Sequence, residues 1–184
     1  EMANGELLLD HYLAMSPGEE NSIDGIDTVE PSFGLPAKWI TELVKEEAEM
    51  LGYTVVDPPS VVSTHLTEII RANASELLGR QETKQLIDHL HETSPILVEE
   101  LTPTPMAIGE IQKVLANLLR ENVSVRNLPI IFETLADYSK LTSDVDVLTE
   151  YVRQGLARQI TTQYVGNQPE LKVLTVSAKV EKIV

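Results

Sequence analysis

The histidines and carboxylates are the side chains of this sequence best suited to metal binding or acid–base chemistry. The densest group is Asp-His-Leu-His-Glu at residues 88–92, which contains His89 and His91. On a helix these two imidazoles point about 200° apart, because each residue turns the chain by about 100°. The pair therefore cannot chelate one ion, and two surface histidines on an amphipathic helix are the favoured interpretation.

Other signatures of enzyme chemistry are weak or missing from the sequence. His65 stands in Ser-Thr-His-Leu-Thr-Glu, in the predicted first turns of a helix, where packing or hydrogen bonding is favoured over catalysis. The sequence contains no cysteine, no Gly-x-x-x-x-Gly-Lys-Ser/Thr, no Gly-x-Gly-x-x-Gly and no Gly-x-Ser-x-Gly. We therefore expect no enzyme activity, no cofactor and no metal. The alternative is a metal enzyme or hydrolase that uses His65 or the His89/His91 pair.

The stretch Val-Glu-Pro-Ser-Phe-Gly-Leu-Pro, residues 29–36, suggests chemistry of a different kind. It places Phe33, one of only two phenylalanines, in a loop braced by two prolines. Such a loop loses little entropy on docking, and a rigid aromatic side chain is a typical binding anchor. Glu30 adds a charge beside it. The alternative is that Phe33 folds back onto the helix expected to follow, near Trp39 or Ile40.

The distribution of charge limits the possible partners. The 184 residues carry a net charge of −15, and residues 1–57 hold thirteen acids against two bases, which leaves −11 for that segment and −4 for the remainder. A phosphate backbone would be repelled, and no basic stripe is present, so nucleic-acid binding is not expected. The acidic segment is either a solvated face or a docking surface for a basic partner. No signal peptide or run long enough to span a bilayer is visible.

The spacing of apolar residues and turn signals predicts an α/β module followed by a nearly all-helical region. In the module we expect strands at 5–15 and 53–56, an acidic loop at 23–35, and a helix from Pro36 that stops at Gly52. Further helices are expected to start at Ser60, to follow Gly79 over 80–92, to restart after 102–105 at Ile108, and to run over 127–135 and 143–156.

The overall prediction is an α+β protein of several subdomains. A small α/β subdomain is followed by a mostly helical subdomain and then by the start of a further α/β subdomain. Strand-like residues return at 170–180, with no partner strand after them, and the sequence does not begin with Met. Both features predict that the chain is part of a longer protein.

Several long blocks carry a resemblance to a known family. They include Val-Glu-Pro-Ser-Phe-Gly-Leu-Pro-Ala-Lys-Trp-Ile, Asp-Pro-Pro-Ser-Val-Val-Ser-Thr-His-Leu-Thr-Glu-Ile-Ile and Val-Arg-Gln-Gly-Leu-Ala-Arg-Gln-Ile-Thr-Thr-Gln-Tyr. Taken together and in this order, they resemble the cytoplasmic part of the flagellar and type III secretion export-gate (FHIPEP) family, specifically its flagellar member. The resemblance extends from about Gly5 to Tyr164.

The resemblance implies a fold and a function for the parent protein. Members have a membrane-embedded half and a cytoplasmic half of four subdomains, which assembles as a nonameric ring at the cytoplasmic face of the bacterial inner membrane. Residues 1–57 would be most of the second subdomain, 58–77 the returning helix of the first, 78–157 the helical third, and 158–184 the start of the fourth. The expected partners are flagellar export chaperone–substrate complexes, other soluble export-apparatus proteins and further copies of the chain.

The resemblance also implies binding residues. In the family, chaperones dock with an acid and a phenylalanine of an Asp/Glu-Pro-x-Phe motif, matched here by Glu30 and Phe33, and with a threonine of Thr-His-Leu, matched by Thr64. Glu30 stands where many members have Asp, and it is expected at the rim of the phenylalanine anchor. Besides this docking module, a purely structural fragment remains an alternative.

Overall fold

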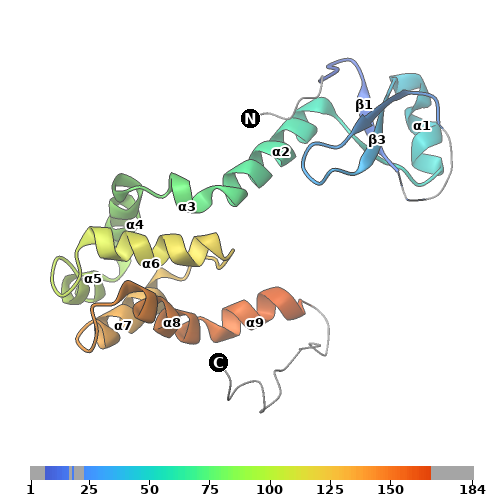
Figure 1. Ribbon diagram of the computed structural model, residues 1–184. Helices are drawn as coiled ribbons and strands as arrows, with labels where there is room; N and C mark the ends of the chain where they lie inside the picture. The colour runs from blue at the N-terminus through green and yellow to red at the C-terminus, as the bar shows by residue number, and fades with distance from the viewer. Residues whose placement is uncertain (1–6, 17, 19–22, 167–184) are drawn as a thin grey trace, which may run out of the picture. The chain divides into compact units, whose positions relative to one another are not determined.

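The computed structural model describes residues 7–16, 18 and 23–166, which form two compact units. The first unit extends to Asn73 and the second begins at Ala74. The first contains a sheet and two long helices, whereas the second is helical (Figure 1). This organisation confirms the predicted α+β class, with a small α/β part ahead of a mostly helical part.

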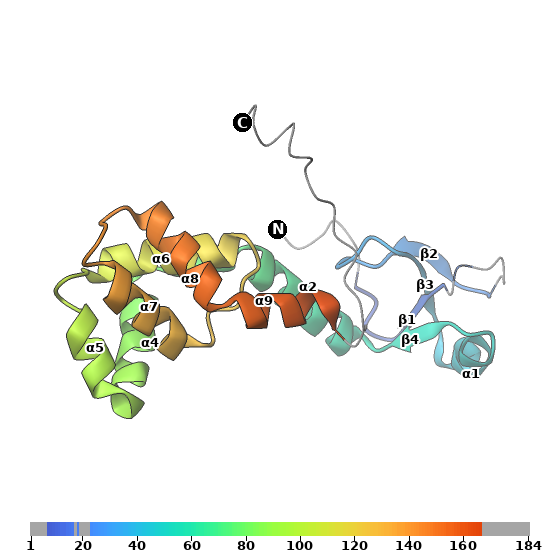
Figure 2. The same cartoon turned by 90° about the horizontal axis from the view of Figure 1, so that it is seen from below.

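The first unit is built on a four-stranded antiparallel sheet with strand order β2-β3-β1-β4 (Figure 2). Its elements, in chain order, are β1 (Tyr12–Met15), β2 (Ile26–Val29), β3 (Pro36–Ile40), α1 (Glu42–Met50), β4 (Thr54–Val56) and α2 (Pro58–Ala72). The two edge strands, β2 and β4, are short, which limits unwanted pairing with other chains.

The two faces of this sheet hold separate cores, because successive side chains of a strand point to opposite faces. Ala14 and Ile40 lie in the cluster that includes Ala48 of α1. Their sequence neighbours Leu13 and Trp39 lie in the cluster that includes Val61 of α2. The sheet is therefore covered by α1 on one face and by α2 on the other.

The strand at Pro36–Ile40 corrects the prediction that a helix begins at Pro36. Proline is compatible with the first residue of a strand. The chain is extended here because β3 pairs with β1 on one side and with β2 on the other. The helix begins only at Glu42, after Thr41. It ends before Gly52, as predicted, and this glycine adopts a φ of +85° that few other residues tolerate.

Three further boundaries differ from the prediction. The expected loop at 23–35 contains β2, and the expected strand at 5–15 is described as a strand only over Tyr12–Met15, with residues 5 and 6 outside the described part. Helix α2 begins at Pro58 after Asp57, not at Ser60, because proline is well tolerated in the first helical turn.

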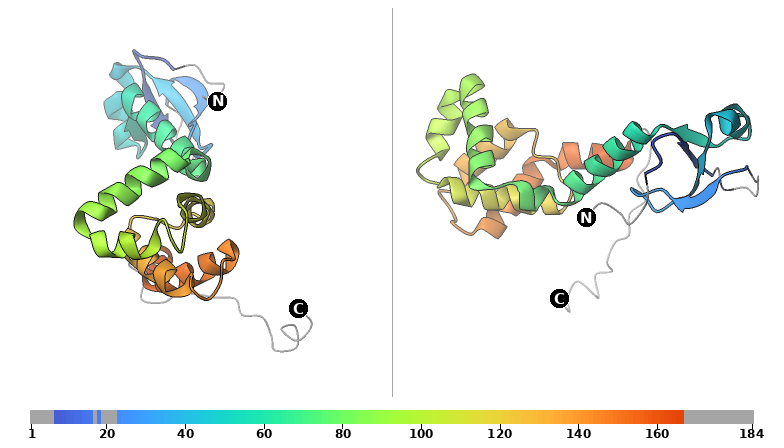
Figure 3. Two further views of the ribbon diagram at one scale, coloured as in Figure 1. Left: turned by 90° about the vertical axis from the view of Figure 1, so that its left-hand side faces the viewer. Right: turned by 90° about the horizontal axis from the view of Figure 1, so that it is seen from above.

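The second unit packs its helices around one apolar core, and Figure 3 shows them from two further directions. Its fully buried residues include Ile111, Leu115, Phe132 and Leu148. The helices are α3 (Ala74–Leu77), α4 (Arg80–Thr93), α5 (Pro95–Leu101), α6 (Ile108–Arg120), α7 (Leu128–Tyr138), α8 (Val145–Gly155) and α9 (Ala157–Val165). The predicted break at Gly79 and restart at Ile108 are confirmed.

The short helices α3, α5 and α9 were not predicted as separate elements, since four to nine residues give a weak periodic signal. Helix α8 is capped by Asp144, whose Oδ1 accepts hydrogen bonds from the backbone N–H groups of Asp146 at 2.9 Å and Val147 at 3.3 Å. Ser143 was the predicted cap. The strand-like stretch 170–180 lies outside the described residues, and the finer four-subdomain division remains a prediction.

Candidate functional site

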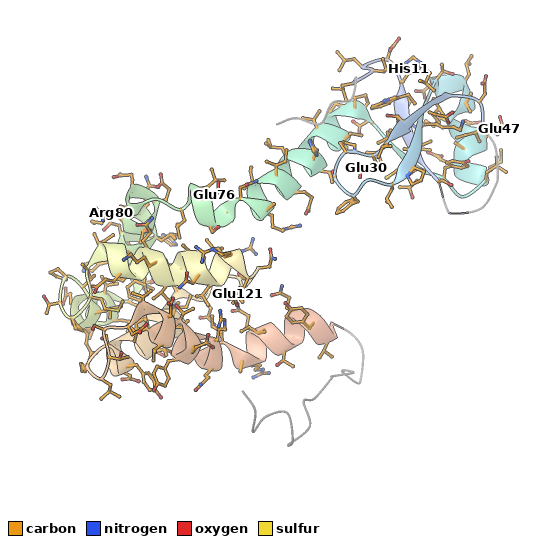
Figure 4. The ribbon with its side chains drawn as sticks, viewed as in Figure 1. His11, Glu30, Glu47, Glu76, Arg80 and Glu121 are labelled. Carbon is orange, nitrogen blue, oxygen red and sulfur yellow. The ribbon has the colours of Figure 1, made fainter. Side chains whose placement is uncertain are left out.

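The loop between β2 and β3 is held by Glu30. Its carboxylate accepts two backbone hydrogen bonds, one from Ser32 N to Oε1 at 2.9 Å and one from Phe33 N to Oε2 at 2.7 Å. The backbone of Glu30 adds two more, accepting from Gly34 N at 3.0 Å and donating to Leu35 O at 2.8 Å. Glu30, labelled in Figure 4, therefore closes the turn with four hydrogen bonds, three accepted and one donated.

The residue types of the loop suit this conformation. Pro31 fixes its own φ and has no N–H that needs a partner. Gly34 adopts a φ of +69°, which is accessible to glycine at little cost. Below the loop, Asp27 of β2 and Lys38 of β3 form an ion pair at 2.7 Å, and this hydrogen bond raises the pKa of Lys38 above its ordinary value. The loop is thus anchored on two paired strands.

Glu30 is positioned differently from the expected rim charge. It is 4% exposed, and both carboxylate oxygens face the backbone of its own loop. A carboxylate placed two and three residues before free N–H groups is drawn inward to cap them. In this structure Glu30 orders the loop, and its role in partner contact remains a prediction.

We expect Glu30→Ala to destabilise the loop by about 1–2 kcal/mol, because both side-chain acceptors are lost. The amide hydrogens of Ser32 and Phe33 should then exchange faster with solvent, which nuclear magnetic resonance measures directly. Glu30→Asp retains two carboxylate oxygens and is the matched control that should stay close to the wild type. Equal exchange in the alanine variant and the wild type would contradict the capping role.

Phe33 projects from this loop into solvent. Its side chain is 63% exposed, so it does not fold back onto Trp39 or Ile40, and that alternative is wrong. The neighbouring Val29 and Leu35 are also exposed large apolar residues. A ring held by a hydrogen-bonded loop and left uncovered has the properties of a preorganised anchor.

Thr64 lies on the exposed surface of α2, in the same compact unit as Glu30 and Phe33. Within the described part of the chain, no hydrogen bond joins it to either residue. The structure therefore brings together two of the three predicted site residues, Glu30 and Phe33, through direct contact. The participation of Thr64 remains a prediction.

His65, His89 and His91 have different neighbours, and no two of them contact the same group in the described structure. His89 Nδ1 lies 3.5 Å from a carboxylate oxygen of Glu92, and His91 Nε2 lies 3.5 Å from one of Glu99. Both ring nitrogens of His65 are buried without a hydrogen-bond partner among the described residues. Over residues 7–16, 18 and 23–166, no group of three or more histidines and carboxylates is arranged to hold a metal ion.

Sequence reasoning missed a groove in the second unit, which we call the α4–α6 groove. It has a volume of about 890 Å³ and lies between one face of α4, the end of α5 and the start of α6. On α4 the groove is lined by residues spaced i, i+4, i+7 and i+11, which are Arg80, Lys84, Ile87 and His91. This spacing places them on one face of the helix, and it is the sequence signal that could have indicated the groove. Its lining includes Arg80, Lys84, Ile87, His91, Ile108 and Lys113.

None of the helices in the described ranges is both long enough and apolar enough to cross a bilayer. This result concerns only the described residues, and it agrees with the short apolar runs of the sequence.

Comparison with known proteins assigns the chain to a family. The profile of the FHIPEP family matches residues 1–184. The flagellar biosynthesis protein FlhA of Bacillus subtilis is 69% identical over 185 residues, which cover 100% of this chain and 27% of the relative. The chain therefore spans about a quarter of the length of the curated relatives it matches.

Solved structures support the same assignment. The CdsV protein of Chlamydia pneumoniae superimposes with a TM-score of 0.80 at 25% identity, over 97% of this chain and 52% of that protein. The nonameric cytosolic domain of EscV, from a type III secretion system, gives a TM-score of 0.69 at 29% identity, over 96% of this chain and 53% of that domain. With matched sequence blocks, fold and full-length profile in agreement, the chain belongs to the FHIPEP family.

Proposed function

We propose that this chain is a cytoplasmic docking and ring-forming module of a flagellar type III protein export gate. Its relatives are named as flagellar biosynthesis proteins, and a similar solved structure is described as the nonameric cytosolic domain of a type III secretion protein. The parent protein would be embedded in the bacterial inner membrane, with this part on the cytoplasmic side. No observation on the described residues favours the metal-enzyme alternative.

The docking partners in this proposal are export chaperone–substrate complexes, together with other soluble proteins of the export apparatus. The observation that supports the proposal most directly is the exposed Phe33 ring on a loop capped by Glu30. Because the loop is already ordered, a partner that encloses the ring gains apolar burial without a large entropic cost. Thr64, on α2 of the same unit, is proposed as a further contact.

Replacement of Phe33 by alanine tests the proposal. We expect affinity for a late-substrate chaperone–cargo complex to fall by roughly tenfold or more, because an aromatic anchor commonly contributes about 2 kcal/mol. Isothermal titration with the complex measures this loss. The fold should be unaffected, since the side chain is 63% exposed and circular dichroism can check this.

Leu141→Ala is the matched control, because Leu141 is 77% exposed but lies in the second unit. Its affinity for the complex should equal that of the wild type. If the Phe33 variant is folded and binds as tightly as the wild type, the docking assignment is wrong and the purely structural interpretation gains support.

A further inference from the structure

The backbone of β2 has an open edge. In the described structure this strand pairs only with β3. In an antiparallel pair, the backbone groups of successive residues point alternately toward the partner strand and away from it. Glu30 N donates to Leu35 O at 2.8 Å, and this pair continues the β2–β3 register. Because Glu30 faces β3, the alternation turns the N–H and C=O groups of Asp27 and Val29 away from β3, toward the open edge.

The pairing of β3 supports this orientation independently. Pro36 stands opposite Val29, and its carbonyl accepts a hydrogen bond from Ser16 N at 3.3 Å on the β1 side. Pro36 has no N–H, so it could not exchange two hydrogen bonds with Val29. Among the described residues, no backbone hydrogen bond from the open side reaches Asp27 or Val29. The edge therefore offers two donors and two acceptors over about 7 Å.

The side chains of β2 leave this edge uncovered. Ile26 is 56% exposed and Val29 is 61% exposed. Natural proteins commonly protect an edge strand with proline, lysine or a bulge, but β2 contains neither residue and pairs with β3 without a bulge. At the other edge of the sheet, Val55 and Val56 of β4 are half-buried, and each packs against one of the two cores. The β2 edge is therefore the less protected of the two.

The surroundings of the β2 edge are acidic. Asp24 and Asp27 are both exposed. Lys38 is paired with Asp27 at 2.7 Å, and this hydrogen bond raises the pKa of Lys38, to which the charge of Asp24 adds, so one base serves two carboxylates. The other base of residues 1–57, Lys45, has its Nζ 4.5 Å from the centre of a tyrosine ring. A partner strand with a lysine or arginine would be attracted here, whereas the β2 edge of a second copy would bring two more carboxylates.

We propose that an extended segment of the docking chaperone pairs with β2 along its open edge and adds a fifth strand to the sheet. The pairing rests on the proposed function, because the same chaperone would enclose Phe33, which follows the end of β2 by four residues. Two outward-facing residues hold a strand only weakly, so backbone pairing and apolar contact with Phe33 would act together. In strand addition, main-chain hydrogen bonds provide affinity and alternate side chains provide specificity. The segment would carry apolar residues beside Ile26 and Val29 and a basic residue near Asp24.

Amide hydrogen exchange of the full chain tests this pairing residue by residue. In the free chain, the amides of Asp27 and Val29 should exchange faster than the amide of Thr28, whose N–H faces β3. Saturation with a late-substrate chaperone–cargo complex should slow the Asp27 and Val29 amides by roughly tenfold or more, while the Thr28 amide changes less. Nuclear magnetic resonance of the chain after quenching resolves the three amides.

Proline substitutions separate the backbone contact from the side-chain contact. Val29→Pro removes an outward N–H, and an edge strand tolerates proline at such a position, so the fold should be retained. Its affinity for the complex should fall roughly tenfold below that of Val29→Ala, which loses the valine side chain but keeps the N–H. Thr28→Pro removes an N–H that faces β3, so this variant should unfold at a lower urea concentration than Val29→Pro.

The outcomes distinguish the strand pairing from the docking function. If Phe33→Ala loses affinity but the Asp27 and Val29 amides stay unprotected in the complex, the strand pairing is wrong and the docking function stands. The same conclusion follows if Val29→Pro binds as tightly as Val29→Ala. If the complex does not bind the wild-type chain at all, the docking function is wrong and the pairing with a chaperone is overturned with it.

A cross-link identifies the protein that supplies the strand. The sequence has no cysteine, so a benzophenone maleimide attached to Ile26→Cys reports only on neighbours of the β2 edge. We expect a photochemical cross-link to the chaperone. A cross-link to the cargo instead, or to a second copy of this chain, would assign the edge to that protein and overturn the pairing with the chaperone.

Discussion

Trp39→Ala is expected to lower the free energy of unfolding of the first unit by about 3–5 kcal/mol. Trp39 is 6% exposed and packs with Leu13 and Val61 between the sheet and α2. It also stands opposite Leu13 of β1 and Ile26 of β2, so its loss weakens both pairings of β3. Since small domains are stable by only about 5–15 kcal/mol, this change would leave little margin.

Urea denaturation followed by circular dichroism measures this effect, with Trp39→Phe as the control. Phenylalanine keeps most of the apolar volume and should lose less stability than alanine. The β2–β3 loop depends on the same strands, so Trp39→Ala should also increase exchange of the Phe33 amide hydrogen. A loss below about 1 kcal/mol would show that Trp39 does not join the sheet to α2 as described.

In the second unit, Phe132→Ala is expected to cost about 3–5 kcal/mol. Phe132 on α7 is 0% exposed and belongs to the core cluster that includes Ile111, Leu115 and Leu135. Close packing from several helices limits collapse around the missing ring, so a cavity would remain and its lining would lose contacts.

The helical signal at 222 nm during urea titration measures this loss of stability. Leu141→Ala is again the control, because a side chain that is 77% exposed should change stability by no more than about 0.5 kcal/mol. Similar midpoints for the two variants would contradict the core assignment of Phe132.

Helices with a long apolar stripe could be predicted from the sequence. In α6, Ile111, Val114, Leu115 and Leu118 recur at helical spacing, and all four are buried. Short elements could not be predicted in this way. In β3 the proline and isoleucine that suggested a helix are the first and last residues of a strand, and only pairing with β1 and β2 decides its conformation.

The candidate site was predicted in part. Prolines and glycine around Phe33 indicated a stiff loop, and the exposed ring agrees with that prediction. The inward direction of Glu30 could not be predicted, because it depends on the backbone N–H groups of Ser32 and Phe33 lying within reach of one carboxylate. The α4–α6 groove required tertiary structure for a similar reason, since its lining comes from three separate helices and the loop before α6.

The cap by Glu30 makes mutational tolerance uneven along the loop. Ser32 contributes its backbone N–H, while its hydroxyl is buried without a hydrogen-bond partner among the described residues. Position 32 is therefore permissive for small side chains but closed to proline, which has no N–H to donate. Position 34, with a φ of +69°, is restricted almost to glycine. A substitution in this loop is therefore tolerated when it keeps the backbone conformation, even if the side chain changes.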